Sequence, residues 1–144
     1  MNIRARVENR NGVHRVALST NGVGHTIEIP PKPDGFGSSA NGGELLFLAL
    51  ATCYCNDVYR EAARAGITVE SVGVEVEGEF GGVGEPARNV TYRARVVARD
   101  STETEVRRLL RHTDSVAEVQ NTLRVGVDVQ LADLEVEVKA EREE

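Results

Sequence analysis

The chain has 144 residues, which is enough for one domain that buries roughly 68–70% of its unfolded surface around a single core. Hydrophobic residues make up 40% and charged residues 28%, and the net charge of -6 argues against nucleic acid or a polybasic membrane contact as a partner. Aromatic residues make up only 4%, so we expect a core of Val, Leu, Ile and Ala that is thin for a monomer.

The cysteine content and the apolar runs indicate where the protein works. The only two cysteines, Cys53 and Cys55, are too close in sequence to act as a long-range staple, so we expect free thiols in a reducing compartment. The N-terminus lacks the pattern of a signal peptide, and the longest apolar run, Leu45 to Ala51, is far shorter than the about 20 residues that span a bilayer. We therefore expect a cytoplasmic protein without a membrane partner.

The first 30 residues alternate between apolar and polar side chains in the manner of strands. Asn11-Gly12 and Asn21-Gly22 interrupt the alternation, and Asn-Gly is typical of type I′ hairpin turns, in which both residues have positive φ. The pattern predicts an N-terminal antiparallel meander over about 1–30. Its strands are expected at about 2–9, 13–19 and 24–29.

A proline-rich stretch and a glycine-rich loop follow the meander. Pro30-Pro31-Lys32-Pro33 ends strand pairing because proline lacks the backbone donor. The loop over 34–43 formally matches a G-x-G-x-x-A nucleotide motif, but no strand runs directly into it and the chain has no G-K-[ST] sequence. These features favour a mobile loop over a nucleotide site.

The middle of the chain predicts a helix and a hairpin. Residues 44–65 indicate one helix that ends at Gly66, and its first half is apolar on every side, which predicts a central, buried helix. Residues 67–99 predict a β-hairpin, with strands over 67–79 and 89–99 on either side of a long loop.

The last third predicts a second helix and further strands. Thr102 and Glu105 have the spacing of a capping box, and apolar residues recur at helical spacing over 102–124. Residues 125–138 alternate again and predict C-terminal strands. The order of elements indicates an α+β fold with antiparallel sheets in a single domain, 1–144.

Few side chains suggest a site on residue type alone. The three histidines show no spacing typical of zinc ligands, so no metal or other cofactor is expected. Cys53 and Cys55 are about 200° apart on a helix, so their sulfurs face opposite sides and cannot easily chelate one metal ion. A cysteine in an apolar helix is ordinarily an inert, small hydrophobic residue, and activation would need a cation from elsewhere.

Two segments carry a family resemblance. The segment from Asn41 to Cys53 resembles the P-x-E-L-L-L-A-A-L-x-x-C signature of the OsmC-like family of osmotically inducible and organic hydroperoxide resistance proteins. The segment from Asp114 to Arg124, with the strand that follows it, resembles the second-helix motif of that family. The resemblance implies an OsmC-like fold, in which antiparallel sheets surround two central helices in an interlocked homodimer.

The resemblance also implies thiol chemistry. In active members a cysteine on the first helix attacks the peroxide O–O bond, and a second-helix cysteine resolves the sulfenic acid. Cys53 falls on the attacking position, whereas Ala117 falls on the resolving position and is followed by Glu118 instead of proline. Alanine cannot form a disulfide, so the usual two-cysteine cycle cannot operate.

Two further positions correspond more loosely to the family pattern. Lys32 is the nearest cation in the stretch where peroxidase members carry an arginine that polarises the thiolate, but lysine lacks the planar fork of arginine. Glu44 resembles the acidic residue that orients this arginine, and it also suits the first turn of a helix as a purely structural residue.

Three functions remain open. The first is a thiol-dependent peroxidase that reduces organic hydroperoxides or H₂O₂ through Cys53, with an external thiol as reductant and Cys55 as a secondary thiol. The second is a non-catalytic, stress-associated dimer that binds small apolar or thiol-reactive molecules. The third, metal or thiol handling by the cysteine pair, has too few ligands.

Overall fold

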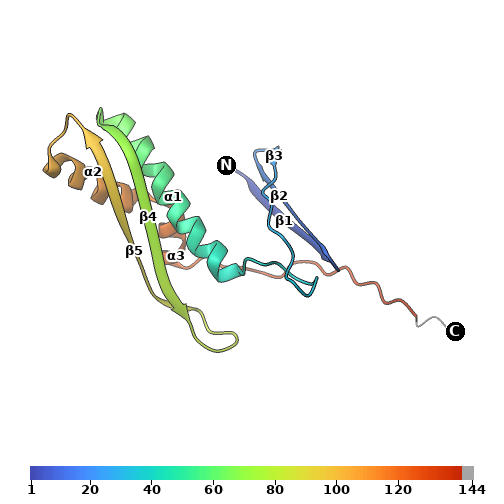
Figure 1. Ribbon diagram of the computed structural model, residues 1–144. Coiled ribbons are helices and arrows are strands. Elements are labelled where there is room, and N and C mark those ends of the chain that lie inside the picture. Colours follow the sequence, from blue (N-terminus) through green and yellow to red (C-terminus); the bar gives the residue numbers. More distant parts are fainter. Residues whose placement is uncertain (141–144) are drawn as a thin grey trace.

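The computed structural model describes residues 1–140 and has the α+β composition that the sequence predicts (Figure 1). A sheet of three strands comes first, followed by a long helix, a two-stranded hairpin and two shorter helices. The elements are β1 (Ile3–Arg10), β2 (Val13–Thr20), β3 (Val23–His25), α1 (Gly42–Ala65), β4 (Thr68–Phe80), β5 (Ala87–Arg99), α2 (Glu103–Val116) and α3 (Glu118–Val125).

The N-terminal sheet confirms the predicted meander, with antiparallel order β1-β2-β3. At the second turn Asn21 (φ 50°) and Gly22 (φ 80°) both have positive φ, as a type I′ turn requires. At the first turn only Gly12 (φ 74°) does, so the type I′ prediction is wrong there. The third strand is shorter than predicted because the chain leaves β2 after His25.

The helix α1 begins at Gly42, two residues before the predicted start, and ends before Gly66 as predicted. Asn41 and Glu44 form a capping box, in which the Asn41 side chain accepts from the Glu44 N–H at 2.8 Å and Glu44 accepts from the Asn41 N–H at 3.1 Å. Gly66 ends the helix in the left-handed conformation, with φ 71°.

Burial of α1 in the single chain is confined to one face. Its buried apolar residues recur every fourth position, whereas Leu48 is 58% exposed. The prediction of burial on every side is therefore wrong for this chain taken alone. The buried apolar residues of this face are Leu50, Tyr54, Val58 and Ala62.

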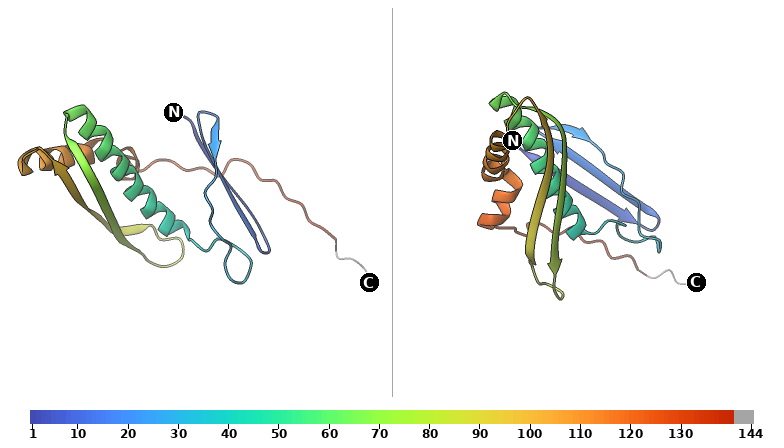
Figure 2. Two further views of the ribbon diagram at one scale, coloured as in Figure 1. Left: turned by 45° about the horizontal axis from the view of Figure 1, so that its top comes forward. Right: turned by 60° about the vertical axis from the view of Figure 1, so that its left-hand side comes forward.

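The buried face of α1 packs against β4 and against α2 and α3 (Figure 2). Tyr54 links these elements, since its hydroxyl donates to the Leu110 carbonyl of α2 at 2.8 Å and its ring contacts Tyr92 of β5 edge-on, with ring centroids 4.9 Å apart. The sheet of β1, β2 and β3 stands beyond the first turn of α1, apart from this body (Figure 1).

The predicted second helix is two helices. Ala117 adopts an extended backbone (φ -69°, ψ 111°), which breaks the chain between α2 and α3. Side chains on both sides of the break bond to backbone carbonyls: the Ser115 hydroxyl donates to His112 at 2.6 Å and the Asn121 amide donates to Ser115 at 3.0 Å. Such local bonds compete with a continuous helix.

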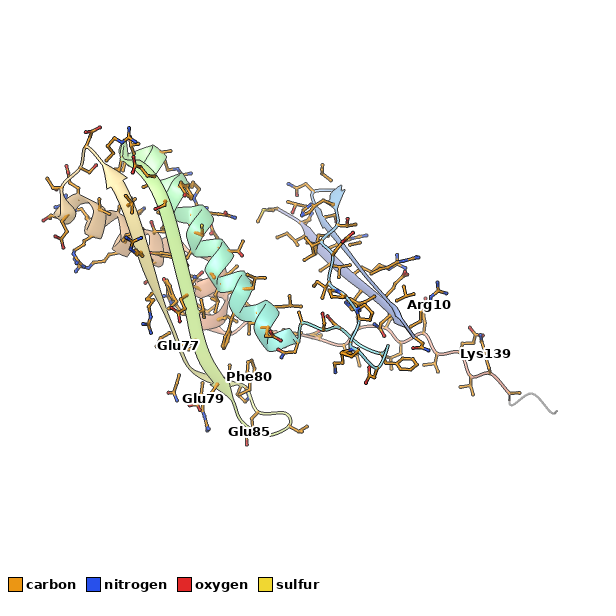
Figure 3. The ribbon with its side chains drawn as sticks, viewed as in Figure 1. Arg10, Glu77, Glu79, Phe80, Glu85 and Lys139 are labelled. Carbon is orange, nitrogen blue, oxygen red and sulfur yellow. The ribbon has the colours of Figure 1, made fainter. Side chains whose placement is uncertain are left out.

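The C-terminal strands predicted over 125–138 are not formed in this chain. Val125 is the last residue of α3, and residues 126–140 follow an extended course without a strand partner among the described residues. Figure 3 shows Lys139 near the end of this course, away from the helices and the hairpin. A strand needs a neighbour to satisfy its backbone groups, and the single chain does not supply one here.

The helices do not include a transmembrane segment. Within residues 1–140 none of them combines the length and the apolar character needed to cross a bilayer.

We predict that Asn41→Ala lowers the free energy of unfolding by about 1 kcal/mol, because it removes the cap that begins α1. Urea titration at a fixed protein concentration measures the change. Asn56→Ala, at an exposed position in the middle of the same helix, is the matched control and should stabilise the protein by about 0.5 kcal/mol. An equal loss in both variants would mean that the Asn41 cap does not hold the helix.

Candidate functional site

The two cysteines lie on opposite sides of α1, as their spacing predicts. The sulfur of Cys53 faces the first turn of α3, where Glu118 begins the helix. Cys55 lies in a shallow depression beside Val74 of β4. Both are free thiols with partial exposure, and each has its own surroundings.

Two carboxylates surround the Cys53 thiol. Its Sγ donates to Asp57 Oδ2 at 3.6 Å, and Glu118 Oε2 lies at 3.9 Å. Asp57 is one helical turn further along α1, so the i, i+4 spacing puts it on the same face as the thiol. The tertiary contact between α1 and α3 brings Glu118 to the same point.

A guanidinium group holds the two carboxylates together. Arg60 Nη1 lies 3.1 Å from Asp57 Oδ1 and 2.9 Å from Glu118 Oε1, while its Nε lies 3.0 Å from Glu61 Oε1. Glu61 is itself buried and also contacts Arg64 (3.2 Å) and His112 (3.3 Å). Arg60 and Arg64 of α1 therefore offset the negative charge of these carboxylates, and His112 adds a contact from α2.

The surroundings of Cys53 do not favour a thiolate. Burial raises the pKa of its thiol, the Val119 backbone N–H lowers it, and the carboxylates of Asp57 and Glu118 raise it, with a net rise above the ordinary value. Burial and Glu118 also raise the pKa of Asp57, against the lowering effect of Arg60. The site thus places a thiol that resists ionisation beside a carboxylate of increased basicity.

The same three residues offer one potential metal-ligand atom each. The sulfur of Cys53 and one carboxylate oxygen each from Asp57 and Glu118 lie within 4.8 Å of one another. The cation that these carboxylates attract is already present, because Arg60 bridges them at hydrogen-bond distance. The geometry describes a thiol within a charge network rather than a metal centre.

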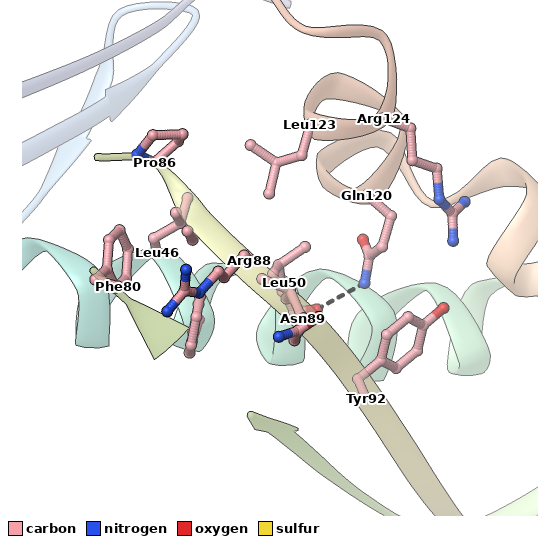
Figure 4. Close-up of a pocket in the computed structure, with 13 residues that line it drawn as sticks. Leu46, Leu50, Phe80, Pro86, Arg88, Asn89, Tyr92, Gln120, Leu123 and Arg124 are labelled. Carbon is pink, nitrogen blue, oxygen red and sulfur yellow. Dashed lines mark hydrogen bonds between the residues drawn. The ribbon is translucent and has the colours of Figure 1, made fainter. Parts of the chain in front are cut away.

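An apolar groove begins one turn before Cys53 on α1. It has a volume of about 620 Å³ and runs between α1, the turn end of the hairpin and α3 (Figure 4). Gln120 is 3% exposed; its amide donates to the Leu50 carbonyl at 3.0 Å, and its Oε1 has no hydrogen-bond partner among residues 1–140. The apolar walls are formed by Leu46, Phe47, Leu50, Phe80, Pro86, Ala87, Val90 and Leu123.

Lys32 and Glu44 do not reach Cys53 within one chain. Lys32 lies in the loop before α1, where its side chain is beside Gly37 and its N–H donates to the Gly37 carbonyl at 3.1 Å. Glu44 belongs to the capping box and precedes Cys53 by nine residues, or about 13.5 Å along the helix axis. Their predicted catalytic roles are not met by contacts in this chain.

Ala117 occupies the junction between α2 and α3 and is fully buried. The next two residues, Glu118 and Val119, are the ones that approach the Cys53 sulfur. The position predicted for a resolving residue therefore directly precedes the residues that approach the thiol, and its side chain is a methyl group.

Sequence reasoning missed Asp57 and Arg60. The sequence carried a signal for Asp57, because it lies four residues after Cys53 and so on the same face of the helix, where it is 5% exposed. A carboxylate buried beside a cysteine needs a counter-charge, and Arg60 supplies it from the next turn.

The family can be assigned from a comparison with family models. The model described as OsmC-like protein matches residues 35–132, which is more than half of the chain. The chain belongs to the OsmC-like family. The matched segment contains α1, the hairpin, α2 and α3, and so includes every residue that approaches Cys53.

Solved structures of OsmC-like proteins have the same fold. The OsmC-like protein of Mycoplasma pneumoniae is 20% identical, with 88% of this chain and 87% of that chain covered and a TM-score of 0.60. An organic hydroperoxide resistance protein from Elizabethkingia anophelis is 18% identical, with 88% and 90% covered and a TM-score of 0.59.

A further organic hydroperoxide resistance protein, OsmC from Legionella pneumophila, is 18% identical, with 90% of this chain and 94% of that chain covered and a TM-score of 0.55. None of the curated proteins compared with this chain matches it. At these identities the likeness establishes the fold alone.

Proposed function

We propose that this OsmC-like protein is a thiol-dependent peroxidase that reduces hydroperoxides through Cys53. The observation that carries the proposal is the position of the Cys53 thiol: it is partly exposed, hydrogen-bonded to Asp57, and one helical turn from the apolar groove. Family membership and the organic hydroperoxide resistance proteins among its structural neighbours support the same chemistry.

The proposed cycle uses one cysteine of the protein. The Cys53 sulfur attacks the outer oxygen of ROOH, an S–O bond forms as the O–O bond breaks, and the products are Cys53 sulfenic acid and ROH. An external thiol then displaces water to give a mixed disulfide, and a second thiol releases Cys53 as the free thiol. Ala117 favours this external route because it cannot supply a resolving sulfur.

The groove indicates which peroxides should react best. Its walls are largely apolar, so an organic hydroperoxide gains binding energy there that H₂O₂ does not. We therefore propose organic hydroperoxides as the preferred substrates of Cys53.

A second candidate function is non-catalytic binding. It is favoured by the raised pKa of Cys53 and by Ala117 at the resolving position, both of which oppose a peroxidase cycle of the usual kind. In this alternative the groove binds a small apolar molecule and Cys53 is not oxidised in function.

We further propose that the working unit is a homodimer. Seven apolar side chains with strand-like alternation in the C-terminal segment are exposed in the single chain, by 90% in the case of Val129. The outer edges of β1 and β3 are also unpaired among residues 1–140, and such edges accept further strands. The seven residues, which a second copy would cover, are Val125, Val127, Val129, Leu131, Leu134, Val136 and Val138.

We predict that Cys53 forms sulfenic acid faster with cumene hydroperoxide than with H₂O₂, and with both faster than free cysteine does. The measurement is the second-order rate of sulfenic acid formation. Cys53→Ser should abolish it, whereas Cys55→Ser should leave it largely intact because Cys55 faces β4. A wild-type rate no faster than that of free cysteine would refute the peroxidase and leave the binding function.

We predict a solution mass of twice the 15.6 kDa chain mass, measured by light scattering after gel filtration. Val129→Glu should produce monomers, because it places a charge on the apolar side of the segment. Glu135→Lys changes the charge on the polar side of the same segment and should leave the mass unchanged. A wild-type monomer would contradict the dimer proposal.

A further inference from the structure

The carboxylate of Asp57 is held in a position to exchange a proton with Cys53. Its Oδ1 lies 3.1 Å from Arg60 Nη1, which leaves Oδ2 directed at the Cys53 sulfur at 3.6 Å. The side chain is 7% exposed, so water competes little for either oxygen. The contact is therefore built into the helix and does not depend on a mobile surface group.

Glu118 differs from Asp57 although it is also near the sulfur. It lies 3.9 Å from Sγ, is mostly exposed, and comes from α3. Its second oxygen holds Arg60 at 2.9 Å. Asp57 is the closer and more buried acceptor, and Glu118 with Arg60 fixes its orientation.

We propose that Asp57 is a catalytic residue that takes the Cys53 S–H proton and passes it to the leaving alkoxide, with Arg60 as a positioning residue. This role rests on the proposed peroxidase function. As the sulfur attacks ROOH, the S–H bond breaks and the proton moves to Asp57 Oδ2, while the S–O bond forms and the O–O electron pair leaves with RO⁻. The proton then passes from Asp57 to RO⁻, which gives ROH and Cys53 sulfenic acid.

This role explains why a peroxide-reactive thiol would have acidic neighbours. Negative charges oppose a standing thiolate, and an alkoxide is a poor leaving group unless it is protonated. A carboxylate in contact with the thiol overcomes both obstacles, because it accepts the thiol proton as the sulfur attacks and then protonates the alkoxide. The carboxylates thus lower the population of thiolate, but Asp57 assists the departure of the leaving group.

In Asp57→Asn we expect two reactions of the Cys53 sulfur to change in opposite directions. Alkylation by iodoacetamide needs only the thiolate, and the substitution removes a charge that raises the thiol pKa, so alkylation at neutral pH should become faster. Oxidation by cumene hydroperoxide should become slower, on the order of 10²-fold, because the proton carrier is lost.

The pH profile of the wild-type protein provides a test that needs no variant. The groups around Asp57 are Cys53, Arg60 and Glu61 on α1 and Glu118 on α3, and His112 of α2 reaches Glu61. Well below the thiol pKa the peroxide rate should stay level, and it should fall only as the pH drops through the raised pKa of Asp57, where the carboxylate becomes protonated. In Asp57→Asn the rate should instead follow the thiolate fraction, tenfold for each pH unit.

Glu118→Gln provides the matched comparison, since it also removes a carboxylate beside the sulfur. It should speed alkylation and keep the ratio of peroxide rate to alkylation rate far closer to the wild-type value than Asp57→Asn does. Glu103→Gln, at an exposed position at the start of α2, should change neither rate.

Three results would overturn the role of Asp57. A variant Asp57→Asn that gains speed in both reactions would show that Asp57 acts only as a charge. A wild-type peroxide rate proportional to the thiolate fraction at every pH would show the same. A wild-type rate no faster than that of free cysteine would refute the proposed function together with this role, whereas the first two results leave the peroxidase standing.

Discussion

The packing of α1 against the start of α3 is the contact on which the candidate site depends. Gln120 of α3 donates to the Leu50 carbonyl at 3.0 Å, and Arg60 of α1 bonds to Glu118 at 2.9 Å, on either side of Cys53. The break at Ala117 makes this contact possible, because it turns α3 so that its first residues face the helix. A continuous helix over 102–124 would not direct the residues that begin α3 at the Cys53 thiol.

The surroundings of α1 differ on the two sides of this contact. Toward the start of the helix the surface is apolar and open, with space for an organic molecule in the groove. Toward its end Asp57, Arg60 and Glu61 form a charged network that α2 and α3 complete. Cys53 lies at the boundary, where an apolar substrate and a proton carrier can meet at one sulfur.

Local signals predicted most of the fold and little of the site. The second hairpin turn and the end of α1 depend on neighbouring residues, so Asn21-Gly22 and Gly66 were interpreted correctly from the sequence, whereas the Asn41 cap was not predicted. The break at Ala117 was missed although local side-chain bonds of Ser115 and Asn121 accompany it. The unpaired state of 126–140 was missed because strand pairing depends on a distant partner. For the site, the family resemblance indicated Cys53 and the i+4 spacing could have indicated Asp57, whereas the approach of Glu118 is a tertiary contact that no local pattern reports.

The central claim, that Cys53 is oxidised by peroxide beside the start of α3, is tested most directly by Ala117→Cys in a Cys55→Ser background. One equivalent of cumene hydroperoxide should convert this protein to a disulfide within each chain, between Cys53 and the introduced thiol. Mass spectrometry should show the loss of two hydrogens, reversed by dithiothreitol. A chain that keeps both thiols, or whose Cys53 accumulates sulfinic acid without a disulfide, would contradict the account.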